Sequence, residues 1–290
     1  MSFCTFLKKL GKFLLWVVPP IFLLVVVWVL AYFLMPQPAV GIIRLNMDIW
    51  SDSAQLVQYQ IEAARKDDRV KAVVLQLDTP GGEVVATQNI YLELQKLRQE
   101  MPVVGSIDTV AASGGYYAAM AADPLYARPS SAVGNVGVWA FVPEDLAVND
   151  EIIASGPFKL TGSNREEFMR ELEGIKREFL GTVSSQRGER LKISEAELSQ
   201  GLLYPGREAA RLGLVDYIGS HTEAIEEAAR QAGISNYEVV DLQILALKEL
   251  YGDLFFEPEP WIGAADPLTG ERSLPYGIYL LYDARIRGVP

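Results

Sequence analysis

The chain has 290 residues, enough for one large domain or two small ones with a sizeable core. Its formal net charge of −11 at pH 7 and the lack of a basic stripe argue against nucleic-acid binding. The single cysteine, Cys4, excludes intramolecular disulfides, and one histidine without a CxxC pair gives no metal-ligand spacing. The sequence therefore predicts neither a metal nor another cofactor.

The N-terminal part contains an apolar run, Phe13 to Met35, that carries no charge and is interrupted only by Pro19-Pro20. A helix needs roughly 20 apolar residues to cross a bilayer, and membrane helices tolerate proline. Lys8, Lys9 and Lys12 precede the run. The positive-inside tendency therefore predicts a single-pass cell-membrane protein with a cytoplasmic N-terminus and an extracytoplasmic remainder.

A cleaved signal peptide is the competing interpretation of this N-terminal run. The apolar core of such a peptide is usually about 7–15 residues long, whereas this run is longer and leads into Met35-Pro36-Gln37-Pro38. We therefore expect an uncleaved anchor. The predicted organisation is a cytoplasmic segment at 1–12, a transmembrane anchor at 13–35, a folded domain at 36–243 and a C-terminal extension of unknown role at 244–290.

Beyond residue 36, strand-like apolar runs alternate with amphipathic segments. The patterns predict strands at Gly41–Met47, Val70–Leu77 and 102–107, and helices at Ala54–Arg65, Val84–Arg98 and Tyr116–Ala122. This alternation predicts an α/β fold with a mostly parallel sheet and right-handed crossover helices. In such folds, functional sites gather at the carboxyl ends of the strands.

The second half of the chain continues the alternation less regularly. Helices are expected at Arg165–Gln186, Pro205–Leu212 and Thr222–Ala232, and a strand at Leu214–Ile218. The pattern loosens after about Ile244, and Glu257–Pro260 is a linker-like break. The last apolar stretch, Gly277–Tyr282, predicts either an edge strand or a peptide that docks on a groove.

Two glycine-rich turns follow predicted strands. One is Asp78-Thr79-Pro80-Gly81-Gly82, and the other holds Ser113 between small residues just before a good helix former. A serine at such a strand-to-helix turn can present its hydroxyl beside the free amides of the new helix. That arrangement suits attack on a carbonyl and stabilisation of the resulting oxyanion. The alternative is an N-cap serine on an ordinary helix.

A nucleophilic serine needs a base, and the sequence offers two kinds. His221 lies at the mouth of a predicted helix, where a surface cap position without a catalytic role is the simpler interpretation. Lys159 lies in a stretch of small and apolar residues, 152–164, that carries no other charge. A lysine acts as a base at pH 7 only if burial lowers its pKa by about 3 units from roughly 10.4. A structural lysine at a strand end is the alternative.

Several runs of the sequence, in this order, resemble the signal peptide peptidase A (protease IV) family. The motifs are Asp78–Gly82, Ala112–Tyr117 with Asp123, Gly134–Val138, Ser155–Lys159, Gly206–Ala210, and Gly213–Asp216 with Gly219. The match covers roughly residues 40–235. It implies the fold shared by the Clp proteolytic subunit and crotonases, which agrees with the predicted alternation.

The resemblance also implies site residues and an activity. Ser113 would be the nucleophile, Lys159 the general base, and the amides of Gly82 and Gly114 the oxyanion hole. Family members of this type cleave peptides such as released signal peptides. They assemble into membrane-facing rings or domes, in which the serine and the lysine come from one protomer or from two. We therefore expect peptide substrates, a homo-oligomer, membrane attachment through the N-terminal helix and no nucleic-acid partner.

Two positions depart from the family pattern. Asn135 stands where the family usually has a serine that helps to hold the lysine, and its carbonyl oxygen is a candidate for orienting Lys159. Thr79 replaces the usual serine before Pro-Gly-Gly, which is a milder change. Asn135 leaves open a second interpretation, a catalytically silent membrane-anchored scaffold of the same fold. A third, an acyl-CoA enzyme, is disfavoured by the predicted anchor and by the lack of a basic cluster.

Overall fold

The computed structural model describes residues 16–17, 19–26, 36–141, 155–156, 158–159, 162–251 and 278–281. The chain divides into two compact units, Met1–Pro38 and Ala39–Pro290. In the first unit, the described residues between 16 and 26 are helical. Among the described residues, no helix has both the length and the apolar character needed to span a membrane. Much of the predicted anchor at 13–35 lies outside the described residues.

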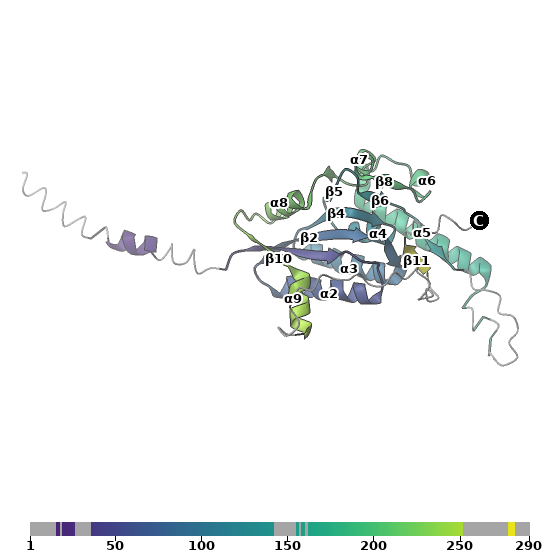
Figure 1. Cartoon of the computed structure of the whole chain (residues 1–290), viewed down its shortest axis with the longest axis horizontal. Helices are drawn as coiled ribbons and strands as arrows, with labels where there is room; N and C mark the ends of the chain where they lie inside the picture. Colours follow the sequence, from purple (N-terminus) through teal and green to yellow (C-terminus); the bar gives the residue numbers. More distant parts are fainter. Residues whose placement is uncertain are drawn as a thin grey trace, which may run out of the picture. The chain divides into compact units, whose positions relative to one another are not determined.

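The second unit is built on an eight-stranded sheet within the described residues, with the strand order β10-β1-β2-β4-β5-β9 (Figure 1). The other two of the eight strands lie off this path: β6 pairs with β4, and β8 pairs with β6. All pairs are parallel except the antiparallel pair β6–β8. The strands are β1 (Ala39–Leu45), β2 (Val70–Thr79), β4 (Val103–Ala112), β5 (Leu125–Ala127), β6 (Ala132–Gly134), β8 (Leu203–Pro205), β9 (Tyr217–Ile218) and β10 (Glu238–Asp241).

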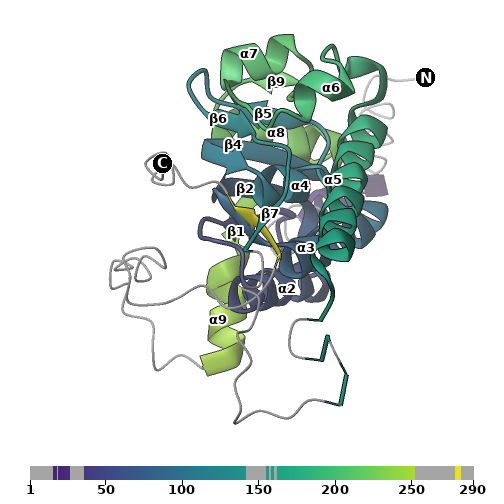
Figure 2. The ribbon, with the colours of Figure 1, turned by 90° about the vertical axis from the view of Figure 1, so that its right-hand side faces the viewer.

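Helices cover both faces of this sheet, as expected for a largely parallel arrangement. Alternate strand residues such as Ile43 and Leu75 face one side and share a core with residues of α2, α3, α4, α5 and α9. Their neighbours, such as Ile42 and Val74, face α8 on the other side (Figures 1 and 2). The helices are α2 (Ser51–Lys66), α3 (Val84–Glu100), α4 (Gly114–Ala119), α5 (Arg165–Arg187), α6 (Glu195–Leu198), α7 (Gly206–Arg211), α8 (His221–Gln231) and α9 (Leu242–Tyr251), with a 3-10 turn at Gly188–Arg190.

A second, three-stranded sheet lies beside the first within the described residues. Its order is β3 (Gly81–Glu83), β11 (Ile278–Leu281) and β7 (Trp139–Ala140). β11 runs antiparallel to both neighbours, so the C-terminal apolar stretch does form a strand. Because it lies between β3 and β7, it is an inserted strand and not an edge strand of the main sheet.

Several predicted boundaries change in the structure. β4 extends to Ala112, beyond the predicted end at 107, because parallel pairing with β6 continues through Val110–Ala112. β9 is limited to Tyr217–Ile218, and the preceding Leu214 and Val215 are buried without strand pairing. After residue 241 the chain forms α9, which packs against α2 and β1 although the sequence pattern loosens there.

Candidate active site

Ser113 lies in the turn between β4 and α4 and has an unusual backbone conformation. Its φ of 53° and ψ of −119° lie in a region that favours glycine, so the residue is strained. Two backbone hydrogen bonds hold it there: its N–H donates to Gly134 (2.9 Å) and its carbonyl accepts from Tyr117 (3.0 Å). The residue is 2% exposed in the described chain. An observed strain of this kind is typical of functional sites.

The first amides of α4 lie next to this serine. The helix begins at Gly114, and its first internal backbone bond runs from Tyr117 back to Ser113. The N–H groups of Gly114, Gly115 and Tyr116 therefore have no partner within the helix. One of these amides is that of Gly114, whose role as an oxyanion donor stays a prediction.

The second predicted amide donor, Gly82, lies in the middle of β3. Ile49 donates to the carbonyl of Gly81 (2.8 Å) and accepts from the amide of Glu83 (2.8 Å). Because successive peptide groups of a strand point to opposite sides, the N–H of Gly82 points away from Ile49 and toward β11. A Cβ at position 82 would lie 1.9 Å from the Ile49 carbonyl oxygen, so only glycine fits.

The strands β3 and β11 and the helix α4 contact one another. The two glycine-rich turns, which contain β3 and the start of α4, therefore both lie next to β11. Residue 280 of β11 pairs with Gly82, and residue 279 pairs with Trp139 of β7. The segment 278–281 thus runs as an extended peptide between two strands and against the helix that Ser113 caps (Figure 2). The sequence analysis offered no role for Trp139, because a two-residue strand leaves no periodic pattern.

Asn135 directly follows β6, whose last residue, Gly134, accepts the hydrogen bond from the Ser113 amide. Asn135 has a positive φ of 55°. Its side-chain Nδ2 donates to the carbonyl of Gly201 (2.7 Å), and its backbone N–H donates to Leu202 (2.8 Å). The side-chain amide is therefore anchored to the segment before β8, and within the described part of the chain its Oδ1 accepts no hydrogen bond.

Lys159 lies in a short turn, where its amide donates to Gly156 (3.2 Å) and Phe158 accepts from Gly162 (2.7 Å). The lysine is exposed in this chain, and Phe158 is 46% exposed. In both ribbon views the described pieces of this segment lie beyond the N-terminal end of α5 (Figures 1 and 2). No bond between Lys159 and Ser113 is present among the described residues.

His221 begins α8, on the sheet face opposite α4, and is half-buried. Burial lowers its pKa, an effect that Arg44 and Arg128 reinforce and Asp108 opposes. Ser220, not His221, forms the capping box of α8 with Glu223. His221 is thus the first residue of the helix and not its cap.

Two tyrosine side chains of α4 anchor this helix to the rest of the domain. The Tyr116 hydroxyl donates to the Leu214 carbonyl (2.8 Å), and the Tyr117 hydroxyl donates to Glu178 (2.9 Å). Burial raises the pKa of Tyr117 to about 12. These contacts are not predictable from the sequence, because the tyrosine pair carries no local signal of partners 98 and 61 residues away.

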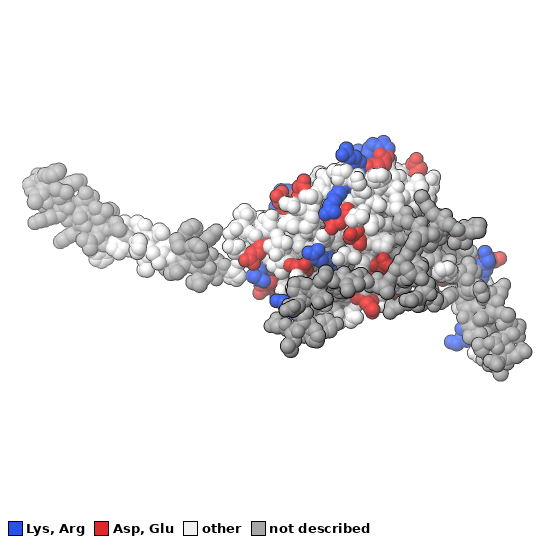
Figure 3. All heavy atoms as spheres, in the orientation of Figure 1, with Lys and Arg blue, Asp and Glu red and all other residues white. Residues whose placement is uncertain are grey.

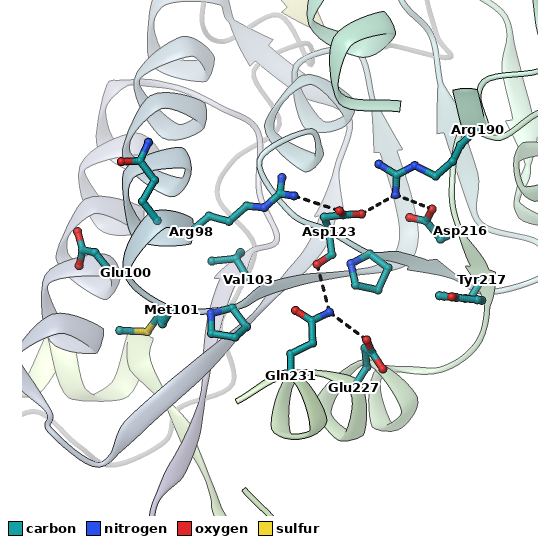
Figure 4. Close-up of a pocket in the computed structure, with 13 residues that line it drawn as sticks. Arg98, Glu100, Met101, Val103, Asp123, Arg190, Asp216, Tyr217, Glu227 and Gln231 are labelled. Carbon is teal, nitrogen blue, oxygen red and sulfur yellow. Dashed lines mark hydrogen bonds and ion pairs between the residues drawn. The ribbon is translucent and has the colours of Figure 1, made fainter. Parts of the chain in front are cut away.

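A cavity of about 650 Å³ opens at the other end of the main sheet, near the start of β4 and β5 (Figure 4). Asp123 accepts from Arg98 (3.0 Å) and from Arg190 (2.6 Å), and Arg190 also reaches Asp216 (3.0 Å). These charges neutralise one another. The face in Figure 3 likewise shows acidic and basic side chains interspersed. The cavity is separate from the serine turn, because it opens near the start of β4, whereas the serine turn follows the carboxyl end of that strand.

Comparison with known proteins identifies the class of this domain. The Peptidase family S49 model matches residues 95–235, and the model for the NfeD1b N-terminal domain matches residues 39–142. The first match includes the serine turn, Lys159 and the Gly213–Asp216 turn. The domain is a peptidase of family S49.

Similar curated proteins narrow this class further. The chloroplastic serine protease SPPA of Arabidopsis thaliana is 30% identical over 62% of this chain and 28% of its own length. Protease 4 of Salmonella typhi is 30% identical over 62% of this chain and 31% of its own length. A protein named as a protease in Methanocaldococcus jannaschii is 28% identical over 68% of this chain and 67% of its own. The chain belongs to the signal peptide peptidase A family.

Proposed function

We propose that this protein is a serine endopeptidase that cleaves extended peptides through an acyl-enzyme at Ser113, with Lys159 as the general base. One observation carries the proposal: Ser113 has a strained backbone conformation that favours glycine, and it is the N-cap residue of α4. The first backbone amides of this helix have no partner within the helix. Strain of this kind has no use in a plain N-cap, whose usual conformation is extended. It is the expected result of aiming a side chain at a reacting group.

The geometry around Gly82 supports a peptide as substrate. β11 lies antiparallel between β3 and β7, so main-chain groups on both walls pair with an extended strand, and a substrate would displace β11 to reach them. A substrate that binds by strand addition uses these groups for affinity and its side chains for specificity. Released signal peptides contain an apolar core, and they are the substrate class that we propose.

The proposed chemistry follows from the positions of the donors. Lys159 takes the proton of the Ser113 hydroxyl as the oxygen attacks the scissile carbonyl. The amides of Gly82 and Gly114 then donate to the oxyanion, each stabilising the transition state by about 3–4 kcal/mol. Lys159 returns the proton to the leaving amine and next activates the water that releases the acyl group.

A neutral amine requires that Lys159 be covered, and the lysine is exposed in the single chain. We therefore propose that the active form is a homo-oligomeric ring or dome, in which a neighbouring copy covers the turn around Lys159. The exposed Phe158 beside it supplies apolar surface for such a contact. The anchored amide of Asn135 leaves Oδ1 available to accept from the lysine amine.

We also propose that residues 13–35 anchor the protein in the cell membrane, with the peptidase domain on the extracytoplasmic side. The uncharged run and the preceding lysines support this arrangement. Alkaline carbonate extraction of membranes tests it. The full chain is expected in the pellet, and a chain starting at Pro36 in the extract; release of the full chain would contradict the anchor.

Two substitutions test the catalytic assignment. Ser113→Ala and Lys159→Ala are each expected to reduce peptide cleavage by at least a thousandfold in folded protein, because each removes a member of the reacting pair. Lys176→Ala, which changes a partly exposed lysine of α5 that pairs with Glu173, is the control and should keep full activity. Labelling by a fluorophosphonate at Ser113 separates a peptidase from a silent scaffold, because a scaffold does not label.

Mixing the two inactive variants tests where the pair forms. If Ser113 and Lys159 come from different copies, co-assembled Ser113→Ala and Lys159→Ala chains regain part of the activity. If both residues come from one chain, the mixture stays inactive. Full activity of either variant alone would end the serine–lysine assignment.

A further inference from the structure

Thr79, the last residue of β2, lies between the two glycine turns of the candidate site. It is 0% exposed, and it pairs with Ala111 of β4 after a shift in strand register. The turn that follows it leads to Gly82, and the strand beside it leads to Ser113. Each of these turns supplies one proposed oxyanion donor.

The side chain of Thr79 contacts both turns with different groups. Its Oγ1 accepts a hydrogen bond from the amide of Gly81 (3.2 Å), whose φ is 103°. Its Cγ2 methyl and its carbonyl oxygen each lie 2.7 Å from where a Cβ on Gly115 would be. The hydroxyl thus holds the peptide before Gly82, and the methyl packs against the first turn of α4.

We propose that Thr79 is a positioning residue that sets the spacing between the Gly82 and Gly114 amides. This inference rests on the proposed function. An oxyanion donor must lie about 2.7–3.1 Å from the oxygen that it stabilises, so a small shift of one turn removes its benefit. A β-branched side chain has a restricted χ1, so its hydroxyl and its methyl are held at a fixed angle to each other.

Two nearly isosteric variants separate the two groups. Thr79→Val keeps a methyl toward Gly115 and removes the acceptor for the Gly81 amide. Thr79→Ser keeps the acceptor and removes the methyl. Thr87→Val is the matched control: Thr87 is also 0% exposed, and its Oγ1 has no hydrogen-bond partner among the described residues. It lies in α3, and its hydroxyl forms no hydrogen bond with either turn.

The kinetic test compares peptide cleavage with binding of a peptide aldehyde, which forms a tetrahedral adduct at Ser113. Thr79→Val is expected to lower kcat about tenfold or more, with KM unchanged, because the donors act in the transition state. Aldehyde affinity should fall by the same factor. Thr79→Ser should stay within about threefold of the parent, since the hydrogen bond remains. Thr87→Val should match the parent.

Amide hydrogen exchange supplies a readout that does not depend on activity. Exchange across residues 80–83 is expected to accelerate in Thr79→Val and to stay unchanged in Thr87→Val. If the parent neither cleaves peptides nor labels at Ser113, the proposed function fails, while the exchange data still report on Thr79. Unchanged exchange in Thr79→Val, or a loss in KM alone, would overturn the positioning role. If Thr79→Val does not fold, Thr79→Ser tests the role of the methyl group. Unchanged amide hydrogen exchange in the first turn of α4 of Thr79→Ser would contradict that role.

Discussion

Arg187 and Asp216 form a two-bond ion pair inside the domain, with nitrogen–oxygen distances of 2.8 and 2.9 Å. Their side chains are 2% and 9% exposed, and Arg187 also donates to the Gly213 carbonyl (2.7 Å). Asp216 accepts from the amide of Leu125 (2.8 Å). The pair therefore joins α5, the turn before β9 and the start of β5, next to the carbonyl that anchors Tyr116.

Removing one partner of this pair should be strongly destabilising. Arg187→Ala removes the buried partner of Asp216 and leaves only the more exposed Arg190 beside the carboxylate. We expect the free energy of unfolding to fall by about 3–5 kcal/mol, because the two hydrogen bonds from the buried guanidinium are lost. Urea denaturation followed by tryptophan fluorescence measures the change. Arg211→Ala, which breaks an exposed pair with Glu208, is the control and should leave stability unchanged. Equal effects of the two variants would contradict the structural role of the buried pair.

The same carboxylate predicts a loss of stability in acid. Burial raises the pKa of Asp216, but the bonds from Arg187 and Leu125 outweigh it, so the pKa lies below its usual value. The contribution is complete above the unfolded-state pKa of about 3.9 and is lost as pH falls through the lower folded-state value. Unfolding free energies measured from pH 7 to pH 3 should decline less steeply in Asp216→Asn. An unchanged slope would contradict this assignment.

The strained backbone at Ser113 predicts opposite effects on stability and activity. Ser113→Gly relieves a conformation that costs other residues about 1–3 kcal/mol, whereas Ser113→Ala keeps it. We expect the glycine variant to be more stable than the alanine variant by about 1–2 kcal/mol, with both unable to cleave peptides. Thermal and urea unfolding check the order. Equal stabilities would mean that the turn relaxes in the alanine variant.

Pairing of β11 with β3 predicts that the chain's own C-terminal strand competes with a substrate peptide. Leu280→Pro removes the backbone N–H at the position that pairs with Gly82 and disfavours strand pairing. Losing about 1 kcal/mol of pairing should raise Ser113 labelling by a fluorophosphonate about fivefold. Leu280→Ala keeps the N–H and is the control. Equal labelling of the two variants would show that β11 does not limit access.

The long helices were predictable from sequence because their apolar residues recur at helical spacing. The ends of α2, α3 and α5 fall within about three residues of the expected positions. Short strands such as β5, β6 and β8 have three residues each, too few to show any period. β4 was predicted too short because Asp108 and Thr109 interrupt its apolar run, although pairing with β6 continues.

The turns of the candidate site were predictable where a motif carries its own backbone geometry, whereas the catalytic roles of Ser113 and Lys159 stay predictions. Glycines at 82 and 115 mark close backbone approaches, and the structure supplies the reasons in Ile49 and Thr79. The position of Lys159 relative to Ser113 did not follow from the sequence, because it depends on contacts between segments that are far apart in the chain. Insertion of β11 beside Gly82 was equally hidden, since strand pairing between distant segments leaves no local pattern.

The backbone at position 113 also separates the two interpretations of this chain on evolutionary grounds. Glycine at this position would relieve the positive φ of 53°, so a chain that only folds or scaffolds has no physical reason to keep a serine here. A reactive hydroxyl would supply such a reason. Relatives that have lost their chemistry should therefore reveal themselves first by a glycine at this turn.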